Sequence, residues 1–108
     1  MRVIVVGCGR MGAELALALA REGREVTVVD RDRGAFARLG AGFAGTTLEG
    51  VGFDRDVLRL AGVENCDALA ALTAGDNANI IIARVARNIF RVPAVVARVY
   101  DPRRAKIY

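Results

Sequence analysis

The chain of 108 residues is 54% hydrophobic and carries a net charge of +4, with two cysteines and no histidine. Its length suits one domain with its own core and is too short for two domains of ordinary size. Its arginines are scattered through predicted helices without interleaved aromatic residues, so we expect a solvated basic surface and no nucleic-acid partner. The chain lacks both a signal pattern and an apolar run of the roughly eighteen residues that a membrane helix needs, which predicts a cytoplasmic domain.

An unbroken β-branched run opens the chain and ends in three closely spaced glycines. Val3–Val6 predicts a buried strand, and Ala13–Glu22 is rich in strong helix formers. Between them, Gly7 permits a tight turn, Gly9 leaves room for a pyrophosphate, and Gly12 lets the helix pack closely on the strand. The first N–H groups of such a helix, with the positive end of its dipole, attract phosphates.

An acidic residue follows where a nucleotide-binding unit requires one. The second predicted strand, Glu25–Val29, leads into Asp30, eighteen residues after Gly12. A carboxylate there accepts hydrogen bonds from both hydroxyls of an adenosine ribose. The succession of strand, glycine turn, helix, strand and acid predicts a nucleotide-binding Rossmann unit. A βαβ turn with an unused acid at its tip stays open as the alternative.

The rest of the chain continues to alternate strands with helices. That pattern predicts a parallel sheet with right-handed crossovers, an α/β Rossmann-like doubly wound fold with strand order 3-2-1-4-5. In chain order we predict a helix at 31–39, an edge strand at 43–48, a loop at 49–53, a helix capped by Asp54, a strand at 68–72, a polar loop at 73–79, a helix to about Phe90 and a strand at 94–97.

Apolar spacing predicts which side of each helix faces the sheet. Leu15 and Leu19 mark the first helix, and Phe36 and Leu39 mark the second. The long helix near the end of the chain has a stripe of sheet-facing residues: Ala78, Ile81, Ile82, Val85, Ala86 and Ile89. Three more apolar residues lie partly outside this stripe, which fits either a wide buried face or packing against another subunit: Ile80, Ala83 and Phe90.

The last eight residues have the pattern of another helix start, with Asp101 as the cap and Pro102 at the first position. A doubly wound domain usually continues to a sixth strand, which this chain is expected to lack. We interpret residues 1–108 as a single domain without that strand.

The two cysteines, Cys8 and Cys66, are predicted to lie at opposite ends of parallel strands. Such ends are roughly 17 Å apart, whereas a disulfide needs Cα atoms within about 7 Å. Two free thiols are therefore expected. Without a histidine to activate it, Cys8 is interpreted as a small residue that fits the turn, and no catalytic or metal-ligating residue is assigned.

Five stretches of the chain together resemble one known family. They are residues 3–12, 28–32, 57–62 followed by 66–68, 73 with 76–79, and 97–102, which include VIVVGCGRMG, VVDRD and ARVYDP. In order and spacing they are similar to the N-terminal nucleotide-binding domain of potassium uptake and potassium channel regulators, the TrkA-N or KTN family. The resemblance covers essentially the full length. It implies a non-enzymatic domain that binds NAD(H), ATP or ADP, forms dimers that assemble into a ring, and gates a membrane potassium transporter or channel from the inner face of the cell membrane.

The resemblance also implies ligand-binding roles for the residues that match the family's motifs. The phosphate turn comprises Gly7, Cys8, Gly9, Arg10, Met11 and Gly12, with Arg10 reaching the phosphates. Asp30 binds the ribose, and Arg31 lies beside the adenine. The second half of the cofactor, or its distal phosphates, meets residues of the later loops: Thr73, Asp76, Asn77, Asn79 and Arg98.

One position departs from the family's pattern. Many members carry Gly-Asp after the third strand, where the acid meets the adenine amino group, and this chain has Gly50 and Val51. Valine cannot accept that hydrogen bond, which reduces adenine selectivity by about 1 kcal/mol.

Some of the implied site residues also have simpler explanations. Arg10 can be a solvated arginine on a helix start, since exposed arginines are the norm. Asp76 and Asn77 can cap a helix. Arg98 can pair with Asp76 or Asp101 in a structural role.

The leading interpretation is a nucleotide-sensing regulatory module, whose ligand binds between the first and fourth strands and biases a two-state assembly. The alternative is the cofactor-binding half of an NAD-dependent oxidoreductase, which the same glycine turn and acid would serve. Hydride transfer needs a substrate pocket and a proton donor, and the chain has no histidine and no room for a second domain. An interaction module that has lost ligand binding is the third interpretation.

Overall fold

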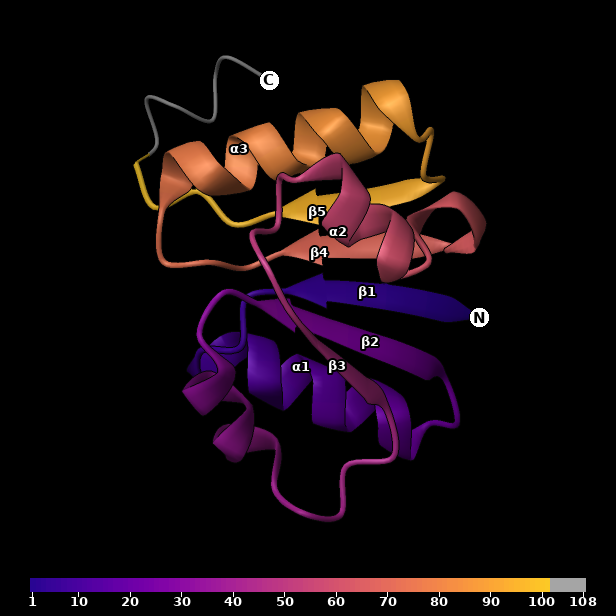
Figure 1. The fold of residues 1–108 in the computed structure, drawn as a ribbon, viewed down its shortest axis with the longest axis vertical. Coiled ribbons are helices and arrows are strands. Elements are labelled where there is room, and N and C mark those ends of the chain that lie inside the picture. Colours follow the sequence, from indigo (N-terminus) through magenta and orange to yellow (C-terminus); the bar gives the residue numbers. More distant parts are fainter. Residues whose placement is uncertain (102–108) are drawn as a thin grey trace.

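Five parallel strands form one sheet in the order β3-β2-β1-β4-β5, which confirms the predicted order and the α/β Rossmann-like fold. The computed structural model describes residues 1–101 of the chain. Figure 1 shows the strands with their carboxyl ends at one edge of the sheet. Their bounds are Arg2–Val6 for β1, Glu25–Asp30 for β2, Thr46–Glu49 for β3, Ala68–Ala71 for β4 and Ala94–Ala97 for β5.

Helices join the strands and pack on both faces of the sheet (Figure 1). The α-helices are α1 (Arg10–Arg21), α2 (Arg55–Leu60) and α3 (Asp76–Arg84). The shorter helices are two of 3-10 type, η1 (Arg33–Leu39) and η2 (Val63–Asn65), and a π-helical turn that continues α3, η3 (Val85–Ile89). None of these described helices is long and apolar enough to cross a membrane.

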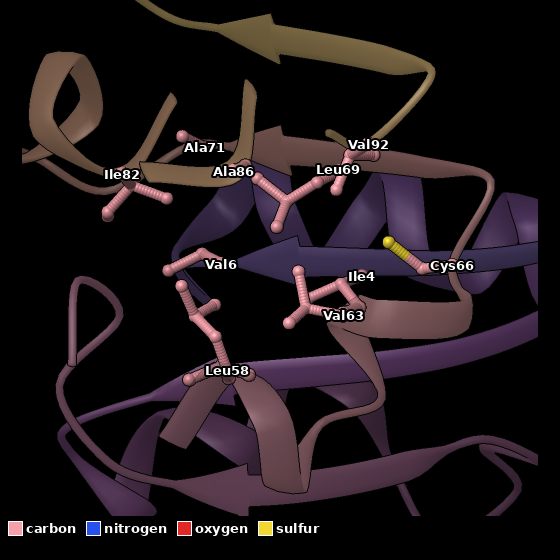
Figure 2. Close-up of a cluster of buried hydrophobic side chains, with 11 residues drawn as sticks. Ile4, Val6, Leu58, Val63, Cys66, Leu69, Ala71, Ile82, Ala86 and Val92 are labelled. Carbon is pink, nitrogen blue, oxygen red and sulfur yellow. The ribbon is translucent and has the colours of Figure 1, made fainter. Parts of the chain in front are cut away.

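The central strand, β1, contributes to two hydrophobic layers. Ile4 and Val6 belong to the layer under α2 and α3, where Leu58 of α2 approaches them (Figure 2). Val3 and Val5 belong to the opposite layer, which side chains of α1 and η1 complete. Successive strand residues face opposite sides, so a strand buried on both faces requires an unbroken apolar run.

The first helix, α1, begins at Arg10, three residues before the predicted start, because the glycine turn leads directly into it. Its buried residues include Ala13 and Ala16, whereas the predicted Leu15 and Leu19 are only partly buried. Small side chains let the helix backbone lie close to the sheet, and the leucines pack at the margins of that contact.

The segment after β2 is a 3-10 helix that begins at Arg33, because the carboxylate of Asp32 accepts a backbone hydrogen bond and caps it there. Leu39 is buried as predicted, and Phe36 is partly buried. β3 lies at the edge of the sheet, which confirms the prediction of an edge strand. The predicted final helix covers residues 102–108, which lie outside the described residues.

The predicted sheet-facing stripe of α3 and η3 is wrong at two positions, because Ile81 and Ile89 are 45% and 42% exposed. Ala83, predicted to lie partly outside the stripe, is buried, as a wide buried face requires. The buried face includes Asn79, whose polar side chain is fully enclosed. Because the prediction placed this asparagine in a polar loop, the predicted apolar face was rotated away from it.

Candidate functional site

A cavity of about 610 Å³ lies at the carboxyl edge of the sheet, and the loops after all five strands contribute to it. The order of strands reverses there between β1 and β4, which is where open α/β sheets bind ligands. Eleven predicted site residues line the cavity: Gly7, Cys8, Gly9, Arg10, Met11, Asp30, Arg31, Gly50, Val51, Thr73 and Arg98. Four predicted site residues do not line it: Gly12, Asp76, Asn77 and Asn79.

The three glycines of the first turn lack side chains for different reasons. Gly7 has a φ of +106°, and a Cβ there would lie 2.7 Å from the backbone of Leu72. A Cβ on Gly12 would lie 1.8 Å from the carbonyl oxygen of Gly7. Gly9 has an ordinary extended backbone, and a Cβ there would meet no protein atom within 4 Å. Packing within the protein therefore explains Gly7 and Gly12 and leaves Gly9 unexplained.

The amino end of α1 opens on the cavity without a side-chain cap. Its N-cap residue is Gly9, and its first turn holds no acidic residue. The N–H of Ala13 donates to the carbonyl oxygen of Gly9 (2.9 Å) and begins the hydrogen-bond ladder of the helix. The N–H groups before it, together with the positive end of the helix dipole, suit an anion.

The acid at the end of β2, Asp30, holds the glycine turn from the side. Its Oδ2 accepts a hydrogen bond from the Cys8 N–H (2.7 Å), and its Oδ1 accepts one from the Asp32 N–H (2.8 Å). A carboxylate has about four acceptor positions, so each oxygen keeps one for a further donor. The two hydroxyls of a ribose are donors of this kind.

The side chain of Cys8 is buried beneath the turn. Its thiol donates to the carbonyl oxygen of Ala35 (3.4 Å). Burial raises the pKa of this thiol, and the neighbouring Asp30 carboxylate raises it further. The thiol therefore stays protonated at neutral pH and is a poor nucleophile. Cys8 and Cys66 are both free, as predicted.

A cavity residue that the sequence did not reveal is Arg38 of η1. Its Nη1 donates to the carbonyl oxygen of Cys8 (3.4 Å). Asp30 therefore binds the N–H of Cys8, and Arg38 binds its carbonyl oxygen. The path of η1 back over the turn creates this contact, and no local motif signals it. Among residues 1–101, the charged residues that line the cavity are Arg10, Arg31, Arg38, Arg98, Asp30 and Asp32. These four arginines and two aspartates give a net positive surface that attracts phosphates.

An apolar wall borders the cavity on the side of β3. It includes Val51 and Phe53, which are both exposed, and sequence reasoning missed Phe53. Beside them, a Cβ on Gly50 would lie 2.8 Å from the side chain of Val57, so this glycine lets the loop pack against α2. The wall offers a planar base apolar contact, and Val51 cannot accept a hydrogen bond from its amino group.

Asn79 lies fully buried beneath the loop that follows β4, away from the cavity surface where a ligand contact would have to be. Its Oδ1 accepts hydrogen bonds from the N–H (2.8 Å) and the hydroxyl (2.6 Å) of Thr73. Its Nδ2 donates to the carbonyl oxygens of Thr73 (3.0 Å) and Arg98 (2.8 Å). These four bonds satisfy the amide and join the loop after β4 to the end of β5.

In the structure, Asp76 neither lines the cavity as a ligand contact nor caps α3. The N-cap of α3 is Gly75, so Asp76 and Asn77 do not cap this helix. Instead, Oδ1 of Asp76 accepts a hydrogen bond from the Tyr100 N–H (2.7 Å), and Oδ2 accepts one from the Asp101 N–H (2.8 Å). The carboxylate thus fixes the segment after β5. Asn77 is exposed and lies outside the cavity lining.

The side chain of Arg98 reaches from the end of β5 to the first turn of α1. Its Nη1 lies 3.4 Å from the sulfur of Met11. Its guanidinium carbon lies 4.0 Å from the centroid of the Tyr100 ring, in a cation–π contact. Tyr100 lines the cavity as well and is a further residue that the sequence did not reveal. Arg98 and Tyr100 together form the wall opposite Asp30.

Comparisons with known proteins agree with this fold. A family model described as the TrkA-N domain matches residues 3–108. The chain is 54% identical over its full length to a Trk system potassium uptake protein TrkA of Streptomyces coelicolor and spans 48% of that protein. Over 92% of its length it is 41% identical to a Trk system potassium uptake protein TrkA of Halomonas elongata and spans 22% of that protein. The chain thus spans about half or less of these curated relatives.

A solved structure described as the Shewanella denitrificans Kef CTD in AMP bound form is also similar. The TM-score is 0.85 at 22% sequence identity, and the match covers 100% of this chain and 65% of that one. At this level of identity the likeness establishes the shared fold.

Proposed function

The chain belongs to the TrkA-N family, and from that premise we propose that it is a regulatory domain that binds an adenine nucleotide and controls a potassium transporter or channel. Its ligand is NAD(H), ATP or ADP. Binding in the cavity at the carboxyl edge of the sheet changes the conformation of the domain, and this change is passed to the membrane protein.

The observation that carries this proposal is the space above Gly9. A Cβ at this position would meet no protein atom within 4 Å, and the backbone there is one that any residue adopts. Close packing within the protein therefore does not require glycine at this position, whereas it does at Gly7 and Gly12. A phosphate that approaches the turn and the amino end of α1 would need this space.

The other cavity groups fit the rest of such a ligand. Asp30 keeps acceptor positions for the ribose hydroxyls, and the apolar wall with Val51 offers contact to the base. The phosphates would lie at Gly9 and Arg10. A ligand that continues past them towards β4 and β5 would meet Thr73 and Arg98.

The relatives suggest the partner and the place of action. The Streptomyces and Halomonas proteins are Trk system potassium uptake proteins, and the Kef structure is an AMP-bound form. By analogy, the domain would act as a homodimer or a larger ring, in the cytoplasm at the inner face of the cell membrane, next to a potassium transporter or channel subunit.

A binding role suits this cavity better than a catalytic one. The chain contains no histidine, and the thiol that borders the cavity is buried and protonated. The oxidoreductase alternative would require a proton donor and a substrate pocket that this proposal does not need. Substrate-dependent oxidation of NADH by the purified chain would favour that alternative.

Isothermal titration of the chain with NADH, NAD, ATP and ADP tests the proposal. We expect at least one nucleotide to bind and Asp30→Ala to weaken it by more than about tenfold, because the variant loses two hydrogen bonds to a charged acceptor. Asp67→Ala is the matched control, since its carboxylate also accepts a backbone hydrogen bond (2.7 Å, from Arg2) but at the other end of the sheet. A folded chain that binds none of the four at millimolar concentration contradicts the proposal.

A further inference from the structure

The cavity has two sides, because β1 lies between β2 and β4 in the sheet. Asp30, at the end of β2, borders one side, and Thr73 and Arg98, after β4 and β5, border the other. Under the proposed function, the ribose of an adenine nucleotide lies on the Asp30 side and its first phosphate at the turn. Only the part of a ligand beyond that phosphate extends to the second side.

The wall on this second side consists of two loop segments, and α3 fastens them together. Asn79 binds both segments through its buried amide, with three hydrogen bonds to Thr73 and one to the carbonyl oxygen of Arg98. This asparagine has no exposed surface, so it cannot touch a ligand in this conformation.

A second residue of α3 fastens the same wall one turn earlier in the helix. The carboxylate of Asp76 accepts hydrogen bonds from the backbone N–H groups of Tyr100 and Asp101, at 2.7 and 2.8 Å. The ring of Tyr100 in turn makes the cation–π contact with the Arg98 guanidinium. Asp76 thus fixes the support of Arg98, although Asp76 itself is not part of the cavity lining.

We propose that Asp76 and Asn79 are positioning residues for the second side of the nucleotide site: they do not contact the ligand but hold Arg98 and Tyr100 where the portion beyond the first phosphate binds. This inference rests on the proposed function. It predicts a selective effect, because AMP ends at the glycine turn and does not need the second wall, whereas NADH extends across it.

Titration of the Asp76→Asn variant with NADH and with AMP tests the inference. The substitution keeps the size of the side chain and leaves one backbone N–H without its carboxylate acceptor. We expect the affinity for NADH to fall about tenfold, the effect of one charge-assisted hydrogen bond. The affinity for AMP should stay within about twofold. An equal loss for both ligands, or no loss for either, overturns the inference.

Two further measurements separate positioning from a general loss of stability. Asp67→Asn, at the opposite end of the sheet, is the matched control and should leave both affinities unchanged. In an Arg98→Gln background, Asp76→Asn should weaken NADH binding by no more than about twofold further, because residues that act through one another have non-additive effects. Fully additive losses contradict the proposed route through Arg98.

Amide hydrogen exchange reports the wall directly, without any ligand. The amides of Tyr100 and Asp101 should exchange faster in Asp76→Asn than in the wild type, because their acceptor is weakened. Unchanged exchange means that the carboxylate does not hold this segment, and the inference fails. If the folded wild type binds none of NADH, NAD, ATP and ADP, the proposed function fails and this inference with it. Binding of both with an unchanged ratio in the variant overturns the inference alone.

Discussion

At the scale of single residues, the three glycines of the first turn differ in whether close packing requires them. Gly7 and Gly12 have no room for a side chain. An added Cβ on Gly7 would lie 2.7 Å from the Leu72 backbone, and one on Gly12 would lie 1.8 Å from the Gly7 carbonyl oxygen. Gly9 has free space above it. Packing within the protein thus requires glycine at two of the three positions of the motif and not at the third.

Matched alanine variants test this division. Gly9→Ala should change the free energy of unfolding by less than about 1 kcal/mol, since the backbone is permissive at this N-cap. It should weaken nucleotide binding more than tenfold by occupying the space of a phosphate, an effect above about 1.4 kcal/mol. Gly12→Ala should destabilise the fold by more than about 3 kcal/mol, because its Cβ overlaps a carbonyl oxygen.

Urea denaturation and calorimetric titration with NADH measure both effects. Wild-type affinity in Gly9→Ala would mean that the ligand does not approach the turn. Wild-type stability in Gly12→Ala would mean that α1 can move away from β1.

At the scale of elements, α2 shows how a helix too short to be stable alone is held in place. It has six residues, and isolated helices of that length do not persist in water. The predicted cap is confirmed, because Asp54 accepts a hydrogen bond from the Asp56 N–H (2.8 Å). Leu58 is fully buried between α2 and β1 (Figure 2). Leu58 is the fully buried residue of α2, and Val57 packs against the same cluster, so the cap and these contacts hold the helix in place.

Truncation of the buried Leu58 should destabilise the protein, whereas truncation of the neighbouring Leu60 should not. We expect Leu58→Ala to lower the free energy of unfolding by about 2–5 kcal/mol, as for other buried leucines. Leu60 is 77% exposed, so Leu60→Ala should change it by less than about 0.5 kcal/mol. Urea denaturation followed by circular dichroism compares the two. Similar losses in both variants would show that α2 does not pack as described.

At the scale of the whole molecule, the sheet divides the core into two layers, and each contains one buried thiol. Cys66 belongs to the layer under α2 and α3, and Cys8 to the layer under α1. Burial raises the pKa of both thiols above the ordinary value of 9.0, and the neighbouring carboxylates Asp67 and Asp30 raise it further. Both layers therefore favour the protonated thiol.

This arrangement predicts a loss of stability in alkaline solution. Above pH 9 the unfolded chain releases thiol protons that the folded chain keeps, so the free energy of unfolding falls as the pH rises towards the folded-state pKa. The slope should reach at most about 1.4 kcal/mol per pH unit for each thiol. Urea denaturation from pH 8 to 10 should show a shallower fall for the double variant Cys8→Ser, Cys66→Ser. Equal slopes would contradict the assignment to the thiols.

The sequence by itself determined the features that depend on local pattern. The apolar run Val3–Val6, the glycine spacing and the position of Asp30 placed the first strand, the turn and the acid where the structure has them. The predicted bounds of β5, 94–97, are those of the structure. Alternation of strands with helices allows few topologies, so the strand order also followed from the sequence.

Only the tertiary structure decided which polar residues face the cavity and which hold it together. Asp76 and Asn79 are polar residues of the kind that bind ligands, yet their partners are the Thr73 hydroxyl and backbone groups of Thr73, Arg98, Tyr100 and Asp101. Arg38 enters the site because η1 folds back over the turn. Such contacts join residues distant in the chain, and their geometry depends on the paths of loops, which no local periodicity encodes.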